Sequence, residues 1–406
     1  MPFSYLTHLQ CPKDGRQWDA AVPQRLCECG SPLLARYDLA QVRREVTRAS
    51  LDAEPASLWR YHALLPVGSP GAVVTMGEGM TPVLPLSRYG RKIGVENLSV
   101  KDEGLLPTGS FKGRGAAVGI SRAKELGISR IAMPTNGNAG AAWSAYAARA
   151  GMDALIVMPE NAPEMARKEC VVTGGQLFLV DGLIGDAGRI VERLVARRDW
   201  FPVATLKEPY RLEGKKTMGF EIAEQLGWRV PDVIVYPTGG GVGLIGIHKA
   251  LQELQAVGWI GERLPKLVAV QAEGCAPIVR AFDTGAATAE PWVHGHTLAF
   301  GINVGSAIGD FLILDALRST GGCAVAVTDE AIRRELVSCA ESDGVMFCPE
   351  GAATLAAVKQ LRSTGWLDGN EEVLVLNTGA LPKYPNAITA DPPLLGVDDD
   401  ITSLMP

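Results

Sequence analysis

The sequence predicts an α/β fold in which helices wrap parallel sheets, and two features carry this prediction. From about residue 98, short apolar runs alternate with segments that have the pattern of helices. Two loops of glycine and small polar residues, at 134–140 and 237–243, each follow a run and precede a helical segment. In open α/β sheets such loops lie at the carboxyl ends of strands, where ligands bind.

The alternation can be followed element by element along the chain. The first strand is predicted at 98–101, and a glycine turn leads from it to a helix over 113–127. The later strands are predicted at 131–134, 154–158, 176–180, 201–206, 232–236, 266–271 and 372–377, with helices at 141–151 and 189–198. The first 65 residues lack the alternation and form a separate N-terminal element, and residues 391–400 form a surface tail.

Composition narrows the class of protein. The 406 residues are 47% hydrophobic and 21% charged, which is enough apolar content for a sizeable core. A net charge of 39 − 45 = −6 argues against nucleic-acid binding, and no apolar run approaches the roughly 18 residues that span a bilayer. Eight cysteines are too few for a disulfide framework in a chain of this length. We therefore expect a cytoplasmic enzyme with neither nucleic-acid nor membrane partners.

The loop P-T-G-G-G-V-G at 237–243 predicts a phosphate cradle, because its glycines let backbone N–H groups turn toward an anion at a helix N-terminus. A tight strand-to-helix turn is the simpler interpretation, but it does not require four glycines within five positions. The same loop contains the G-x-G-x-x-G pattern of a dinucleotide site at 241–246. Glu273 then follows Gly246 by 27 residues, rather than the expected spacing of about 20.

Lys112 is the candidate nucleophile. It follows a strand and a Pro/Gly turn, in K-D-E-G-L-L-P-T-G-S-F-K-G-R-G at 101–115, and it opens a helix. The positive end of a helix and partial desolvation both lower the pKa of an amine, and a neutral lysine can form a Schiff base with an aldehyde. A lysine at a helix start is more often a solvated surface charge. The prediction that Lys112 is a nucleophile therefore depends on its occurring together with the two glycine-containing loops and the C-terminal segment.

Taken together, the motifs resemble the fold type II pyridoxal-phosphate enzymes of the tryptophan synthase β-like superfamily, and within them the threonine synthase family. The resemblance runs from about Gly77 to Tyr384, and the block at 209–217 is the part most similar to threonine synthases. The motifs, in family order, are G-E-G-M-T-P (77–82), P-T-G-S-F-K (107–112), G-N-A-G (137–140), E-P-Y-R-L-E-G-K-K-T (208–217), T-G-G-G-V-G (238–243), P-E-G-A-A (349–353) and N-T-G-A-L (377–381).

The resemblance implies roles for individual residues. Lys112 would hold pyridoxal 5'-phosphate and later move protons, Asn138 would contact the 3′-oxygen of the ring, and Thr378 would place a hydroxyl at the ring nitrogen. The cofactor phosphate would lie on Gly239, Gly240, Gly241, Val242 and Gly243. The substrate would be bound by Thr108, Ser110, Thr135, Asn136, Arg211 and Lys215, with Lys216 as a further cation. Simple turn chemistry is the alternative for the hydroxyl and amide residues.

The resemblance also implies a reaction and an organisation into domains. The reaction is the conversion of O-phospho-L-homoserine and water to L-threonine and phosphate by a carbon–oxygen lyase that is a homodimer. The implied domains are the N-terminal element (1–65), a large cofactor domain (66–124 and 206–406) and a small mobile substrate domain (125–205). A serine/threonine dehydratase is the alternative, because Gly113 replaces a common Asp and the cradle resembles that of dehydratases. A nicotinamide-dependent dehydrogenase is a third, more distant alternative for the function.

The N-terminal element carries a second, weaker resemblance. Cys11, Asp14, Cys27 and Cys29 stand where some threonine synthases have the paired ligands of a zinc ribbon. Structural zinc is usually held by paired C-x-x-C knuckles, whereas here one position is an aspartate and the second pair is C-x-C. We expect a degenerate ribbon held by packing with no bound metal, and three thiolates plus a carboxylate binding zinc as the alternative.

Overall fold

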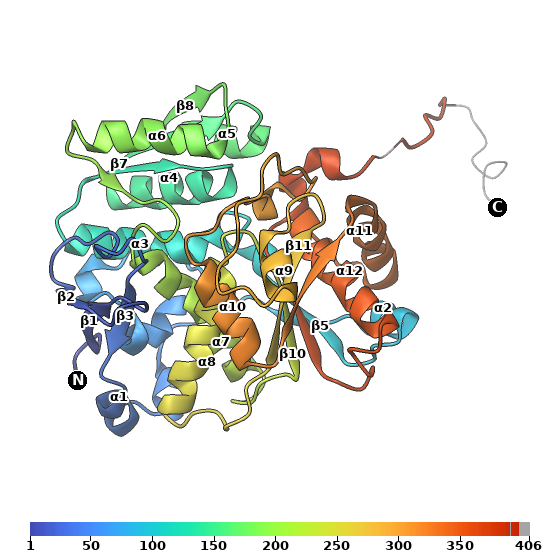
Figure 1. Cartoon of the computed structure of the whole chain (residues 1–406), viewed down its shortest axis with the longest axis horizontal. Coiled ribbons are helices and arrows are strands. Elements are labelled where there is room, and N and C mark those ends of the chain that lie inside the picture. Colours follow the sequence, from blue (N-terminus) through green and yellow to red (C-terminus); the bar gives the residue numbers. More distant parts are fainter. Residues whose placement is uncertain (390, 398–406) are drawn as a thin grey trace.

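The computed structural model describes residues 1–389 and 391–397, whose strands form three sheets (Figure 1). The largest sheet has six strands in the order β12-β11-β10-β13-β5-β4, and all of its pairings are parallel except that of the edge strand β4. These strands are β4 (Val83–Pro85), β5 (Leu98–Asp102), β10 (Val233–Pro237), β11 (Lys266–Ala272), β12 (Cys323–Val327) and β13 (Val373–Asn377).

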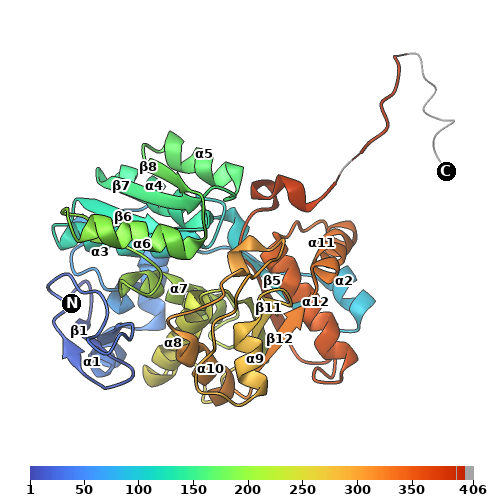
Figure 2. The ribbon, with the colours of Figure 1, turned by 45° about the horizontal axis from the view of Figure 1, so that its top comes forward.

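A second sheet has four parallel strands in the order β8-β7-β6-β9 and lies beside the first, with α4 and α6 on its two faces (Figure 2). Its strands are β6 (Arg130–Pro134), β7 (Asp153–Pro159), β8 (Gln176–Val180) and β9 (Phe201–Pro202). The α-helices of the described residues are α1 (Leu39–Glu45), α2 (Ser87–Ile93), α3 (Lys112–Glu125), α4 (Asn138–Ala150), α5 (Glu164–Val172), α6 (Ile184–Val195), α7 (Tyr210–Gln225), α8 (Val242–Ala256), α9 (Pro277–Asp283), α10 (Asp310–Ser319), α11 (Asp329–Asp343) and α12 (Pro349–Ser363).

Helices cover both faces of the large sheet because successive strand residues point to opposite sides. In β10, Val233 and Val235 pack into one core with residues of α11 and α12. Ile234 and Tyr236 pack into the other core, with residues of α7 and α8. All five residues of this strand are buried, which explains why its sequence is an uninterrupted apolar run.

The N-terminal element is a three-stranded antiparallel sheet in the order β2-β1-β3, formed by β1 (Leu6–Gln10), β2 (Gln17–Trp18) and β3 (Leu34–Tyr37). Leu9 and Ala35 are fully buried and belong to the same core as α7 and α8. The Tyr37 hydroxyl donates a 2.8 Å hydrogen bond to the Glu213 carboxylate of α7. The element therefore shares its core with the large sheet's helices.

The predicted α/β class and the strands predicted after residue 98 are confirmed, with some differences. The helix predicted at 189–198 spans Ile184–Val195. The strand predicted at 201–206 is shorter and ends at Pro202, followed by one more hydrogen bond to the sheet, from the Val203 N–H to the Ala132 carbonyl at 2.9 Å. The helix expected from 141 begins at Asn138. The strand β12 was not predicted. Residues 391–397 of the expected tail are exposed, and its last three residues lie outside the described residues. No helix in the described part of the chain has the length and apolar character to cross a membrane.

Candidate active site

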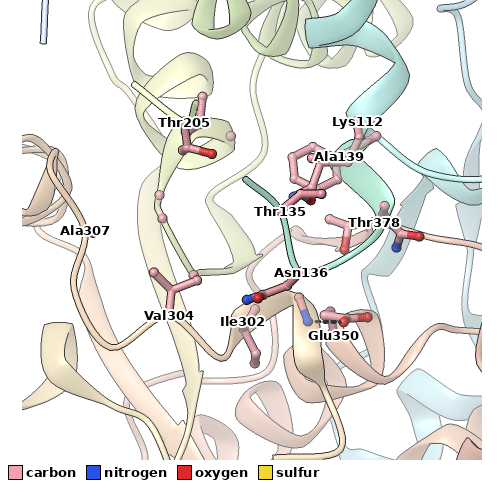
Figure 3. Close-up of a pocket in the computed structure, with 18 of the residues that line it drawn as sticks. Lys112, Thr135, Asn136, Ala139, Thr205, Ile302, Val304, Ala307, Glu350 and Thr378 are labelled. Atoms are coloured by element: carbon pink, nitrogen blue, oxygen red, sulfur yellow. Dashed lines mark hydrogen bonds between the residues drawn. The ribbon is translucent and has the colours of Figure 1, made fainter. Parts of the chain in front are cut away.

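A cavity of about 290 Å³ opens where strand ends of the two parallel sheets face each other (Figure 3). Four of its lining residues stand at or next to the first position of a helix: Lys112 of α3, Asn138 of α4, Val242 of α8 and Glu350 of α12. A helix N-terminus carries unpaired N–H groups and partial positive charge. The convergence of four such ends makes this cavity suited to an anionic ligand.

Lys112 faces this cavity from the first turn of α3. Its Nζ lies 4.0 Å from the centre of the Phe111 ring. Removal from bulk water, reinforced by the nearby Arg211 cation, lowers the pKa of Lys112 to about 8, although the Glu350 carboxylate opposes this shift. A primary amine with a lowered pKa is an effective nucleophile near neutral pH, so the chemistry expected of Lys112 fits its surroundings.

The glycine loop between β10 and α8 also lines the cavity. Gly241 precedes α8 and has the left-handed backbone conformation (φ 74°) that glycine adopts readily. A side chain at Gly239 would place Cβ only 2.8 Å from the Gly301 carbonyl oxygen. The loop therefore needs glycines for its close packing, and it leaves backbone N–H groups at the start of a fifteen-residue helix open to an anion. A phosphate fits this cradle.

Asn138 and Thr378 lie on the same cavity, as predicted. The Asn138 side chain donates a 3.0 Å hydrogen bond from Nδ2 to the Tyr384 hydroxyl. Thr378 follows β13, and its carbonyl accepts a 3.0 Å hydrogen bond from the Phe111 backbone N–H. The Thr378 hydroxyl is 3.8 Å from the Cys348 sulfur. The wall of the cavity therefore offers both an amide and a hydroxyl.

The predicted substrate residues divide into two groups. Thr135 and Asn136, on the loop after β6, line the cavity, and so do Arg211 and Lys215 of α7 (Figure 3 shows the first two). Thr108 and Ser110 are not among the lining residues, and their hydroxyls have no hydrogen-bond partner within the described chain. Their assignment to the substrate stays a prediction.

The two cations of α7 are held differently. The Arg211 guanidinium donates to the Glu208 carboxylate at 3.2 Å, to the Thr205 hydroxyl at 3.1 Å and to the Val203 carbonyl. Lys215 donates to the carbonyl of Phe111. Lys216, considered as a further cation, lies away from the cavity and pairs with Glu213 and Glu253. It therefore has a structural role.

Two groups of lining residues were not assigned by the sequence. The loop that carries Gly301, Ile302 and Val304 covers one side of the cavity, and it has no motif that would have identified it. Glu350 lies in the motif P-E-G-A-A at 349–353, but the sequence assigned it no function. One of its carboxylate oxygens accepts a 2.7 Å hydrogen bond from the Gly301 backbone N–H, and the other has no partner within the described residues although the side chain is 3% exposed. This bond fastens the covering loop to α12 (Figure 3).

Comparisons with known proteins agree with this geometry. Residues 74–379 match the family model described as "Pyridoxal-phosphate dependent enzyme". The threonine synthase of Methanocaldococcus jannaschii is 35% identical over 379 residues, which cover 93% of each chain. That of Methanosarcina acetivorans is 35% identical over 383 residues, or 94% of this chain and 93% of the other. The structure of maize serine racemase has the same fold, with a TM-score of 0.64, 24% identity and coverage of 74% of this chain and 88% of that one.

The family match spans most of the chain and includes the lysine, the glycine cradle and Thr378. It removes the reason for a dinucleotide interpretation of the glycines at 241–246. Because the alignments with these two threonine synthases cover 93 and 94% of the chain, the likeness extends into the N-terminal element. The chain belongs to the pyridoxal-phosphate-dependent enzymes, as a carbon–oxygen lyase of the threonine synthase family with pyridoxal phosphate as its cofactor.

Proposed function

We propose that this protein converts O-phospho-L-homoserine and water to L-threonine and inorganic phosphate. One observation in the cavity, in addition to family membership, supports a phosphorylated substrate. The cavity holds two cationic side chains, Arg211 and Lys215, in addition to the glycine cradle that suits the cofactor phosphate. A substrate with its own phosphate needs such a second group of donors, because an unpaired phosphate in a closed site is very costly. A dehydratase, which expels a hydroxyl, has no such need.

The proposal assigns the cofactor to residues that line the same cavity. Bound pyridoxal phosphate supplies an electron-withdrawing ring that stabilises negative charge on the substrate carbons. Lys112 would hold the cofactor through its ε-amine and, once released, would take the α-proton and then a β-proton. The N–H groups of the loop from Gly239 to Gly243 would bind the cofactor phosphate. Asn138 would donate to the 3′-oxygen, and Thr378 would offer its hydroxyl to the ring nitrogen.

A hydroxyl at the ring nitrogen has a chemical consequence. Unlike a carboxylate, the Thr378 hydroxyl does not force that nitrogen to stay protonated, so electron withdrawal by the ring is moderate. Moderate withdrawal suits a reaction that must eliminate phosphate at one carbon and then add water at another. Thr135 and Asn136 on the facing loop bind the substrate in this proposal. Thr108 and Ser110 would also contact the substrate, once the site has closed.

The two parallel sheets support a division into a cofactor domain (66–124 and 206–406) and a small substrate domain (125–205). The cavity contains residues of both parts, such as Asn136 on one side and Gly240 on the other. Relative movement of these parts would open and close the site. Closure would exclude water from the reacting groups until the step that requires it.

The N-terminal element (1–65) is zinc-ribbon-like in this proposal. The ligand atoms of Cys11, Asp14, Cys27 and Cys29 lie within 4.8 Å of one another. The Cys11 and Cys29 sulfurs are 3.5 Å apart, close to the roughly 3.8 Å between sulfurs bound to one tetrahedral zinc. This spacing supports a bound zinc over a ribbon held by packing alone, so we favour the alternative to the metal-free ribbon expected from the sequence.

We also propose a cytoplasmic homodimer. The compartment is supported by the cysteines, because all eight lie in the described part of the chain and none of them forms a disulfide. The dimer rests on the family resemblance. Size-exclusion chromatography with light scattering should give twice the chain mass, and a monomer at micromolar concentration would contradict the dimer.

The reaction is tested by supplying O-phospho-L-homoserine, L-threonine and L-serine separately and by measuring phosphate, threonine and keto acid. Phosphate and threonine in equal amounts from the first compound support the proposal. Rapid 2-oxobutanoate from threonine, with no phosphate from phosphohomoserine, would establish the dehydratase instead. Lys112→Ala should abolish every one of these activities and the visible absorbance of the bound cofactor, while the far-UV circular dichroism stays unchanged.

A further inference from the structure

One buried lysine of this protein, Lys215, differs from the others because it has no carboxylate partner within the described residues. Among the described residues, Lys101, Lys215, Lys216, Lys249 and Lys383 have buried side chains. Four of them form ion pairs with glutamates at 2.5 to 3.0 Å. Lys215 is the exception, because no carboxylate in the described part of the chain lies within ion-pair distance of it. A buried cation without an anionic partner is costly, so such a residue calls for a function.

Lys215 is placed next to the reacting lysine. Its Nζ lies 4.1 Å from the centre of the Phe111 ring, and the Nζ of Lys112 lies 4.0 Å from the same centre. Both side chains line the cavity. Lys215 also donates to the Phe111 carbonyl, one residue before Lys112. The site therefore contains two amines, each without a carboxylate partner, on one aromatic ring.

The charged groups around Lys215 determine its state. Burial and the cations Lys112 and Arg211 lower its pKa well below the ordinary value, Glu103 opposes this shift and Arg114 adds to it. A lowered pKa makes the Lys215 ammonium a stronger acid than an ordinary lysine. A phosphate dianion beside it would favour the ammonium form, so a bound phosphorylated ligand would keep a transferable proton next to its own oxygens.

The proposed reaction requires this proton. When the phosphate of a monoester dianion leaves, its oxygen that was bonded to carbon must take up one proton, because the phosphate would otherwise leave as a trianion. We propose that Lys215 is the acid that protonates the phosphate as it leaves the substrate, an inference that rests on the proposed function. The bond from the γ-carbon to oxygen breaks with its electron pair on oxygen, and the proton moves from Nζ to that oxygen. The pair from the β C–H bond, whose proton Lys112 takes, forms the new carbon–carbon double bond. The β-proton held by Lys112 then passes to the γ-carbon, the hydroxyl of water adds to the β-carbon, and the proton that water releases restores the Lys215 ammonium.

The other cations of the cavity are less suited to this step. The Arg211 guanidinium is already bonded to Glu208, Thr205 and the Val203 carbonyl, and arginine holds its protons too tightly to donate them. It can hold the phosphate but not protonate it. Lys112 is committed to the cofactor and to the carbon-bound protons.

Two substitutions test the acid role. Lys215→Met removes the amine, and Lys215→Arg keeps the charge without a transferable proton. We expect Lys215→Met to slow phosphate release from O-phospho-L-homoserine about 100-fold or more, the usual effect of losing a general acid. Lys215→Arg should recover KM for this substrate but not kcat. Full recovery of kcat by arginine would show that only charge is needed and would overturn the proposal. Lys359→Met, a half-exposed lysine paired with Glu335 outside the cavity, is the control.

A second measurement separates this role from support of Lys112. A phosphonate analogue, in which carbon replaces the bridging oxygen, cannot lose phosphate but can exchange its α-proton in D₂O. Exchange should fall less than tenfold in Lys215→Met and should vanish in Lys112→Ala. Equal losses of exchange and of phosphate release in Lys215→Met would contradict the acid role.

The same variant also tests whether Lys215 serves the cofactor. The apo form of Lys215→Met should bind pyridoxal phosphate within threefold of the unsubstituted protein. A loss of affinity above tenfold, with pyridoxal unaffected, would assign Lys215 to the cofactor phosphate instead and would overturn the proposal. An unsubstituted enzyme that releases no phosphate from phosphohomoserine would overturn the proposed function and the acid role together, so the two kinds of failure are distinguishable.

Discussion

The Asn138 side chain donates a 3.0 Å hydrogen bond to the hydroxyl of Tyr384, which joins the first turn of α4 to the chain that follows β13. The Tyr384 ring is itself stacked on Phe300, with 5.1 Å between the ring centres. The amide that we propose as a contact of the cofactor ring is thus oriented by a residue 246 positions away in the sequence. The bond connects a helix of the four-stranded sheet with the end of the six-stranded sheet.

Tyr384→Phe should therefore loosen Asn138 without disturbing the ring stacking. One neutral hydrogen bond contributes about 0.5 to 1.5 kcal/mol, so we expect pyridoxal phosphate to bind the apoenzyme about three- to tenfold more weakly. The measurement is a fluorescence titration of the apoenzyme. Tyr89→Phe is the matched control, because its buried hydroxyl donates to Glu335 away from the cavity. Equal affinities for Tyr384→Phe and the unsubstituted protein would contradict this role.

Much of the fold could be predicted because buried parallel strands have a clear signature. The run V-I-V-Y-P of β10 is buried on both faces, and each predicted strand after residue 98 has a similar apolar run. The strand β12 has the sequence C-A-V-A-V and lies at an edge of the sheet, where three of its five residues are only partly buried. Its small residues, Cys323, Ala324 and Ala326, interrupt the run of large apolar side chains by which the others were identified.

The site could be predicted where a motif fixes a local structure. The turn before Lys112 and the glycine loop before α8 have backbone geometries that only certain residues allow. Short sequence motifs therefore identify both places. Lys215 was identified only as a cation, because the absence of a carboxylate partner is a property of the packed structure. Glu350 and the loop at Gly301 meet through a hydrogen bond between residues 49 positions apart, which no short pattern encodes.

The lowered pKa of Lys112 predicts a pH dependence for cofactor attachment. Because the pKa is lowered to about 8, the neutral and nucleophilic amine appears at a lower pH than for an ordinary lysine. The rate at which the apoenzyme takes up pyridoxal phosphate should rise with pH and level off above about pH 8. Stopped-flow absorbance measurements from pH 6 to pH 10 give this profile.

Arg211 provides an internal check on that profile. Its positive charge is the second cause of the shift after burial, so Arg211→Met should raise the pKa of Lys112 and move the plateau to higher pH. A rate that rises steadily to pH 10 in the unsubstituted protein would show that Lys112 titrates as a solvated lysine.

Gly243 is predicted to be essential for the first turn of α8. An added Cβ would lie 1.8 Å from the Tyr236 hydroxyl and 2.2 Å from the ring carbon that bears it, so Gly243→Ala must shift the backbone of the cradle. Overpacking of this kind costs about 1 to 3 kcal/mol, and the shift should also weaken phosphate binding. We expect a lower unfolding midpoint in urea and a cofactor affinity reduced at least tenfold. Gly261→Ala, whose Cβ would meet nothing within 4 Å, should change neither.

The cysteines of the N-terminal element predict one zinc ion per chain. Cys11, Asp14, Cys27 and Cys29 offer three thiolates and a carboxylate within 4.8 Å, and this sheet packs on the same core as α7. Metal analysis of protein purified without chelators should find about one equivalent of zinc, and Cys27→Ala should lose it and unfold at a lower temperature. Cys339→Ala, at a buried cysteine of α11, should keep the metal. Zinc well below one equivalent in the unsubstituted protein, with no stabilisation on adding zinc, would mean that packing alone holds the ribbon.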